Sequence, residues 1–284
     1  MEYRPRPEQA QLLKAAWDHA KSVDYQVSAR WLFYRLLQDG WLSKKADYKR
    51  LIHLLSRARK SFYKDWRPDT LADDTRVVDD AGQGYHDLDE WMEAVADDQV
   101  FSYVDRWQEQ DYYVLVCFEA KAMAPQFDFY LPSWVPRVAF GGDVSIPAKW
   151  KIAQLLARAS SRYEIPTRLI YFGDLDDKGL LIPESARADI EAWLPNGVNF
   201  EYERAGLNPG DQDTYDLAEN PERPGTYQWE ALDDGTAGRL IHGAVESYLN
   251  IEAGERCKEE DVRRMIAFRR WWTDHRPTAE DLGL

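Results

Sequence analysis

The chain has 284 residues, of which 44% are apolar and 13% aromatic, so it is long and apolar enough for two ordinary domains and is not globally disordered. Its two cysteines, Cys117 and Cys257, exclude a disulfide framework. The N-terminus lacks the apolar core of a signal peptide, and no apolar run is long enough to span a bilayer. We therefore expect a cytoplasmic protein without a membrane partner.

Charge is distributed unevenly along the chain. The net charge is −14, yet residues 1–70 hold 15 Lys and Arg against 8 Asp and Glu, which gives them a charge of +7. The remaining residues carry −21. Because phosphate contacts require Lys and Arg, this asymmetry indicates a nucleic-acid-binding part joined to an acidic part.

The basic part, residues 1–78, has the pattern of three short helices. Apolar residues at helical spacing predict the first helix over Pro7–Lys21, and Ser28 is a candidate N-cap for a second that ends near Gly40. The third runs from about Ala46 to Lys60, followed by a possible wing over Phe62–Arg76. Its polar positions include Lys49, Arg50, Arg57, Arg59 and Lys60. These features predict a winged-helix-like module that grips duplex DNA, the alternative being a solvated basic face on a helical bundle.

The remaining sequence favours an α/β fold. Residues 79–110 form an acidic linker and a bracing helix over Leu88–Gln108, and residues 251–284 a C-terminal helical tail. Between them, residues 111–250 alternate strands and helices, which predicts a parallel α/β sheet with right-handed crossovers. The expected strands cover 112–118, 135–140 and 167–172, with further ones possible over 198–202 and 226–229, and the expected helices cover 147–162, 182–194 and 236–249.

Two of these strands end in carboxylates. Asp174 and Asp176 follow the strand that ends at Phe172, and Glu119 follows the strand that ends at Phe118. Since parallel strands end at one edge of the sheet, these three side chains can face one another and hold Mg²⁺ or Mn²⁺ for phosphoryl transfer. The alternative is an acidic loop in which Asp176 or Asp177 only caps the next helix.

Three further side chains are candidates for catalysis. Lys121 can contact a phosphate or Glu119, or it can be an ordinary exposed lysine. Arg30 lies four residues before Tyr34 on the second helix, so its guanidinium can lower the pKa of the phenol and steady a phosphate. The alternative for Tyr34 is packing inside the helical bundle.

The carboxylates carry a family resemblance. Glu119 after one strand and Gly173-Asp174-Leu175-Asp176-Asp177-Lys178-Gly179 after another resemble the TOPRIM metal site. The order of the parts resembles that of the topoisomerase VI A subunit, of the meiotic double-strand-break transesterase and of prophage proteins of the same architecture, over roughly residues 25–250. Arg30-Trp31-Leu32-Phe33-Tyr34 is similar to the Arg-x-x-x-Tyr of that family, and Trp229-Glu230-Ala231-Leu232 also resembles the prophage proteins.

The resemblance implies Mg²⁺-dependent DNA cleavage with Tyr34 as the nucleophile, a homodimer that combines the tyrosine of one chain with the metal site of the other, and a separate ATPase subunit if strands are passed. Two positions differ from the family pattern: Ala120 separates Glu119 from Lys121, and Asp177 stands where the family often has proline. The alternatives are a TOPRIM nuclease that uses metal-activated water, and a phage DNA-binding or scaffold protein that keeps the fold without turnover.

Overall fold

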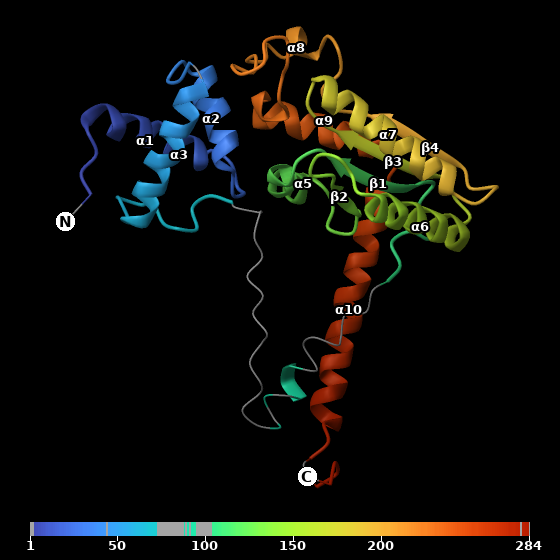
Figure 1. Cartoon of the computed structure of the whole chain (residues 1–284). Helices are drawn as coiled ribbons and strands as arrows, with labels where there is room; N and C mark the ends of the chain where they lie inside the picture. Colours follow the sequence, from blue (N-terminus) through green and yellow to red (C-terminus); the bar gives the residue numbers. More distant parts are fainter. Residues whose placement is uncertain are drawn as a thin grey trace. The chain divides into compact units, whose positions relative to one another are not determined.

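A computed structural model gives the fold of the chain (Figure 1). It describes residues 3–43, 45–72, 88, 90, 92–94, 104–278 and 280–283, with the backbone alone at 45 and 46. The chain divides into two compact units. The first combines residues 1–76 with 112–248, and the second combines 77–111 with 249–284. The three N-terminal helices and the sheet thus share one unit, which holds every candidate site residue.

Three helices open the first unit: α1 (Pro7–Ala20), α2 (Ala29–Gln38) and α3 (Lys45–Lys60). Ser28 caps α2 as expected, because its hydroxyl accepts a hydrogen bond of 3.1 Å from the Trp31 amide. The helices pack through fully buried leucines, among them Leu13, Leu32 and Leu51. Part of the segment predicted to form a wing is described: residues 61–71 form turns, and Ala72 makes a single bridge to Ser28. Residues 73–76 of that segment lie outside the described part of the chain.

The sheet has four parallel strands in the order β2-β1-β3-β4, which confirms the predicted α/β fold with a parallel sheet. The strands are β1 (Tyr113–Phe118), β2 (Arg137–Ala139), β3 (Thr167–Phe172) and β4 (Phe200–Arg204). Both central strands are almost entirely buried, as their continuous apolar sequence predicts. In their register Phe118 pairs with Phe172, so β1 and β3 end side by side.

Helices cover the sheet on both faces. A short 3₁₀ helix, η1 (Lys121–Met123), and α5 (Ala124–Tyr130) connect β1 to β2, which lies on one side of β1. The chain then crosses to β3 and β4 through α6 (Ile146–Tyr163) and α7 (Asp177–Trp193), which pack on each other. Right-handed crossovers in these opposite directions put α5 on one face and α6 and α7 on the other. The order of strands therefore reverses between β1 and β3, where α/β sheets open a ligand crevice.

The chain returns to this crevice after β4. Beyond the short α8 (Asp211–Thr214), Tyr227 makes an isolated antiparallel bridge to Leu175, and a 3₁₀ helix, η2 (Trp229–Ala231), precedes α9 (Asp234–Glu246). The strand predicted over 226–229 is therefore wrong, because this segment pairs at one residue only. Trp229 is fully buried and stacks its edge against Phe172, which holds η2 at the end of β3.

The second unit is built around α10 (Ile251–His275), which Asn250 caps through the Ala253 amide. Asp261 on α10 pairs with Arg106 at 2.6 Å. Residues 106–109 form a turn, so the helix predicted over Leu88–Gln108 does not reach its expected end, and most of that range lies outside the described residues. In the part of the chain that the structure describes, no helix is long and apolar enough to cross a membrane.

Candidate functional site

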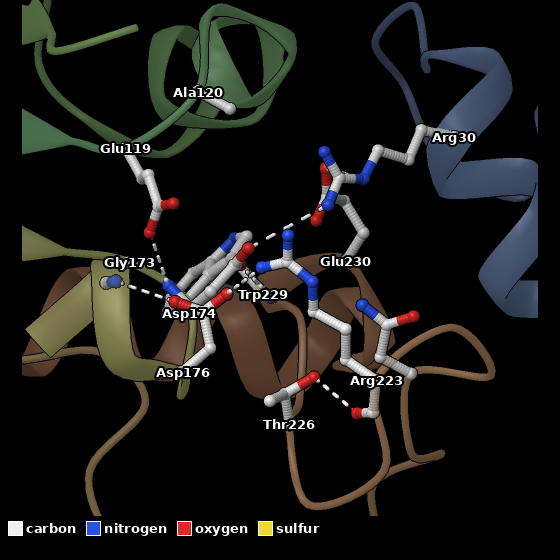
Figure 2. Close-up of polar contacts among 12 residues, drawn as sticks. Arg30, Glu119, Ala120, Gly173, Asp174, Asp176, Arg223, Thr226, Trp229 and Glu230 are labelled. Carbon is white, nitrogen blue, oxygen red and sulfur yellow. Dashed lines mark hydrogen bonds and ion pairs between the residues drawn. The ribbon is translucent and has the colours of Figure 1, made fainter. Parts of the chain in front are cut away.

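The C-terminal edge of β1 and β3 brings two of the predicted carboxylates together. Glu119 is the first residue after β1, and its amide donates to the Phe172 carbonyl at 2.9 Å. Its Oε2 accepts a hydrogen bond of 2.9 Å from the Asp174 amide (Figure 2). Asp174 is 7% exposed, and its Oδ1 accepts from the Trp229 amide at 2.8 Å. Two strands and η2 thus fix Glu119 and Asp174 side by side.

Asp176 has a different local role. It is the N-cap of α7, where its Oδ1 accepts from the Gly179 amide at 2.7 Å. Its Oδ2 lies 3.9 Å from a guanidinium nitrogen of Arg223, on the loop before η2. Figure 2 shows this arginine pointing toward the carboxylates. The capping alternative therefore holds for Asp176, although its second oxygen stays available to a cation.

A fourth carboxylate, Glu230 on η2, joins the cluster and was missing from the predicted site. It is 5% exposed, and its Oε1 has no hydrogen-bond partner among the described residues. The nearest cation is Arg30, whose Nε lies 3.3 Å from Oε1 while its Nη2 lies 3.8 Å from Asp174 Oδ2. Arg30 reaches this position from α2 (Figure 2). The resemblance at Trp229–Leu232 was the sequence signal that could have identified Glu230.

Burial and mutual repulsion control the ionisation of the cluster. Burial raises the pKa of Asp174 well above its usual range, and Glu230 and Glu119 raise it further against the opposing charge of Arg30. Burial also raises the pKa of Glu119, helped by Asp176 and Glu230 and opposed by the Asp174 amide. The carboxylate of Glu230 raises the pKa of Arg30, which stays charged. Ionising the whole cluster is therefore costly with Arg30 as the cation beside Asp174 and Glu230, and either protonation or a bound cation would remove that cost.

Hydrogen bonds from Arg204 hold the loop between β3 and α7 in place. Arg204, the last residue of β4, donates to the carbonyls of Asp174 and Gly179 at 2.6 Å each and to that of Leu207 at 3.0 Å. A Cβ atom at Gly179 would lie 2.3 Å from the Asp174 carbonyl oxygen, so this close turn requires glycine. No feature of the sequence predicted the contribution of Arg204.

Tyr34 lies beside the cluster but is not activated as expected. Its side chain is 4% exposed and lines a pocket of about 260 Å³ together with Arg30. Burial raises the pKa of Tyr34 above its usual range, and although Arg30 lowers it, the carboxylates of Glu230 and Asp174 raise it further. Arg30 therefore lowers the phenol pKa as expected, but the net shift is upward because one guanidinium does not outweigh burial and these carboxylates.

The other predicted residues lie outside this cluster. Lys121 is exposed at the start of η1 and makes no ion pair with a described residue. On α3, Lys49, Arg50 and Lys60 are exposed, while Arg57 lies over the ring of Tyr3 and Arg59 donates to the Pro68 carbonyl at 3.4 Å. Arg50 also lies 3.3 Å from Asp47 on the same helix. The structure therefore brings together Arg30, Tyr34, Glu119, Asp174 and Asp176, and leaves Lys121 and the α3 side chains apart.

The arrangement of the carboxylates is not yet that of a metal centre. Among the described residues, no group of three or more His, Cys, Asp or Glu side chains has the geometry to hold a metal ion. Asp176 is engaged in capping α7, and Arg30 lies between Asp174 and Glu230. The donor set nevertheless fits Mg²⁺, because carboxylate oxygens are its preferred protein ligands and Glu230 Oε1 lacks a hydrogen bond.

Comparisons of the chain with protein-family models, with curated proteins and with solved structures find no match.

Proposed function

We propose that this protein cleaves phosphodiester bonds of double-stranded DNA in the cytoplasm, in a reaction that depends on Mg²⁺ or Mn²⁺. The observation that carries the proposal is the group formed by the half-buried Glu119 and the buried Asp174 and Glu230, whose charge Arg30 alone balances incompletely. Uncompensated buried carboxylates are costly, and a divalent cation removes that cost. The TOPRIM-like order of Glu119 and the Asp174–Asp176 pair supports the same chemistry.

Each residue has a role in this proposal. Glu119, Asp174 and Asp176 would hold the cation, with Glu230 as an additional oxygen donor at the same edge. When bound, Mg²⁺ would neutralise the negative charge that develops on the phosphate oxygens. Arg30 carries a lasting positive charge, since Glu230 raises its pKa, and it is able to bind the phosphate beside the carboxylates.

Tyr34 is the proposed nucleophile. Its phenol oxygen would form a bond to phosphorus while the bond to the leaving sugar oxygen breaks, so that the protein becomes attached to one DNA end. Because burial keeps the phenol protonated near neutral pH, the proton has to pass to a base. The nearby carboxylates of Asp174 and Glu230, which act on Tyr34 electrostatically, are suited to accept it.

The DNA would bind along α3, whose exposed Lys49, Arg50 and Lys60 can contact phosphates, with Arg57 and Arg59 at the same helix end. The family resemblance adds two partners to the proposal, a second copy of the chain and a separate ATPase subunit. In this structure Tyr34 and the carboxylates of the same chain already act on each other, so one chain can contain both parts of the site.

A cleavage assay tests the proposal. We expect purified protein to nick or cut plasmid DNA in Mg²⁺ and not in EDTA. Glu119→Gln and Asp174→Asn should abolish cleavage while keeping the fold, and Glu184→Gln, an exposed carboxylate on α7, should cleave like the wild type. Unchanged cleavage by both Glu119→Gln and Asp174→Asn would show that these carboxylates are not the site of cleavage. Absence of cleavage by every protein, with DNA binding intact, would favour the phage DNA-binding or scaffold alternative.

A specific observation favours a second candidate, hydrolysis by water in place of attack by Tyr34. The raised pKa of Tyr34 makes its phenol a weaker acid than in water, which works against it as a nucleophile. The same carboxylates and Arg30 would serve in that reaction, and no covalent protein–DNA product would form. Tyr34→Phe separates the two candidates.

A further inference from the structure

The pocket beside Arg30 has a composition that the cleavage reaction alone does not explain. Its volume is about 260 Å³, which is enough for several water molecules. It lies between α2, α3 and the loop that precedes η2. Aromatic rings, amides, one proline and two charged groups line it: Arg30, Phe33, Tyr34, Tyr48, Asn220, Pro221, Glu222 and Gln228.

One wall of the pocket is aromatic. The ring of Phe33 makes edge contacts with Tyr34 at 5.4 Å and with Tyr48 at 5.2 Å, measured between ring centroids. The three rings thus form one cluster, and both tyrosines also line the pocket. Aromatic side chains of this kind stack on nucleobases whatever their sequence, because every base has a π face.

Two polar side chains that line the pocket have no hydrogen-bond partner among the described residues. The side chains of Tyr34 and Gln228 are each 4% exposed, and in the described part of the chain neither makes a hydrogen bond. Because both side chains line the pocket, their polar groups are placed to contact a ligand or bound water there. A glutamine amide can both donate to and accept from the edge of a base.

The charges of the pocket argue against a bare anion. Glu222 contributes a carboxylate to the lining. The carboxylates of Asp174 and Glu230, in the neighbouring cluster, are close enough to raise the pKa of Tyr34 in the pocket. A phosphate would be repelled from all but the side where Arg30 lies. The carboxylate of Glu222 and the amide of Gln228 instead suit a neutral heterocycle with an exocyclic amino group. The amino group would donate to the carboxylate, and the edge of the ring would hydrogen-bond to the amide.

We propose that this pocket binds one unpaired nucleobase that carries an exocyclic amino group, which adenine, cytosine and guanine have and thymine lacks, stacked on Tyr48 and read by Gln228 and Glu222. The inference rests on the proposed function in taking DNA as the substrate. The nucleotide in the pocket would place its phosphate at Arg30, next to Glu119 and Asp174. Tyr48 belongs to the same helix as Lys49 and Arg50, so α3 would hold the backbone and the base at once.

Binding of short single-stranded oligodeoxynucleotides in EDTA tests the inference without any cleavage. Fluorescence anisotropy compares a labelled all-adenine oligonucleotide with versions that have an abasic residue at one position at a time. We expect one position at which loss of the base weakens binding about 10-fold, the size expected for one stacked base. Replacing adenine by purine, which lacks the amino group, should weaken binding at that position as well.

Variants connect the effect to the pocket. Tyr48→Leu should abolish the abasic discrimination, Tyr48→Phe should retain it, and Gln228→Leu should reduce the discrimination between adenine and purine. Tyr63→Leu, which changes an aromatic residue beyond the end of α3 and outside this pocket, should leave both ratios unchanged.

Three results would overturn the inference: equal affinity for all abasic probes, the same abasic ratio in Tyr48→Leu as in the wild type, and displacement of the oligonucleotide by inorganic phosphate as effectively as by deoxyadenosine monophosphate. The third result would indicate a pocket for anions.

The proposed function has its own test, which is cleavage of DNA in Mg²⁺. If no DNA is cleaved, the binding measurements in EDTA still decide whether the pocket binds a base.

Discussion

Arg30 and Glu230 form an ion pair at the centre of the cluster, with Arg30 Nε 3.3 Å from Glu230 Oε1. The two residues are 200 positions apart in the sequence and come from α2 and η2. Arg30 is the only cation within 4 Å of Asp174 or Glu230 among the described residues. The pair therefore joins the N-terminal helices to the carboxylate edge of the sheet.

Removing this guanidinium should destabilise the protein in the absence of metal. We expect Arg30→Met to lower the free energy of unfolding by about 1–2 kcal/mol at pH 8 in EDTA, less than for a fully buried pair because the Arg30 side chain is 40% exposed. Adding Glu230→Gln should recover part of the loss, since it removes one of the repelling carboxylates. Urea denaturation measures both effects.

The matched control is Arg187→Met. Arg187 on α7 makes only exposed pairs with Glu184 and Glu191, so its loss should cost less than about 0.5 kcal/mol. An Arg30→Met variant as stable as Arg187→Met would show that Arg30 does not balance the cluster.

The raised pKa of Asp174 predicts a pH dependence with a definite sign. A carboxyl group whose folded pKa lies above its unfolded value stabilises the protein below the unfolded pKa, and this contribution is lost as pH rises through the folded pKa. Asp174→Asn is neutral at every pH, and its side-chain oxygen can still accept from the Trp229 amide. In EDTA we therefore expect the variant to melt at a higher temperature than the wild type at pH 8, with a smaller difference at pH 5.

Magnesium should change the difference in melting temperature between the wild type and Asp174→Asn in favour of the wild type. A bound ion stabilises the folded state by mass action, so Mg²⁺ at pH 8 should raise the melting temperature of the wild type and leave Asp174→Asn unchanged. Equal responses of the two proteins to Mg²⁺ would contradict a site that contains Asp174.

Tyr34→Phe addresses the attacking group. The substitution removes one hydroxyl without a hydrogen bond to a described residue, so the fold and its stability should change by less than about 1 kcal/mol. If Tyr34 attacks, denaturing gels should show labelled DNA attached to the wild type and to Tyr63→Phe, and none attached to Tyr34→Phe. Wild-type cleavage by Tyr34→Phe, with no adduct in any protein, would establish attack by water.

The turn at Gly179 should tolerate no side chain. In Gly179→Ala the new Cβ would meet the Asp174 carbonyl oxygen at 2.3 Å, which requires the loop to shift. We expect a loss of about 1–3 kcal/mol in urea denaturation and of the thermal response to Mg²⁺. Gly243→Ala on α9 is the control, because its Cβ would meet nothing within 4 Å and alanine favours the helix by up to about 1 kcal/mol. A Gly179→Ala protein with unchanged stability would show that the loop is not tightly constrained.

Local sequence predicted the parts of the site that depend on strand ends. The apolar runs ending at Phe118 and Phe172 were enough to put Glu119 and Asp174 at one edge of a parallel sheet, and Ser28 and Asp176 cap helices as their residue types favour. These features follow from contacts between near neighbours in the chain or from strand polarity.

The remaining features arise from the tertiary structure. Glu230 reaches the cluster because Trp229 is buried against Phe172, and Arg204 supports the loop from the end of another strand. The net shift of the Tyr34 pKa depends on how much burial and how many carboxylates oppose Arg30, which helical spacing does not reveal. The 226–229 segment has strand-forming residues but pairs with Leu175 at one residue only.

The central claim is that the carboxylates at the ends of β1 and β3 bind a divalent cation. Anomalous diffraction from crystals grown with Mn²⁺ tests it most directly, because manganese takes the place of magnesium and its position is seen independently of activity. We predict a peak within direct coordination distance of Glu119 and Asp174 in the wild type and none in Asp174→Asn. A wild-type structure in saturating Mn²⁺ with no peak at this edge, and with Arg30 still between Asp174 and Glu230, would contradict the account.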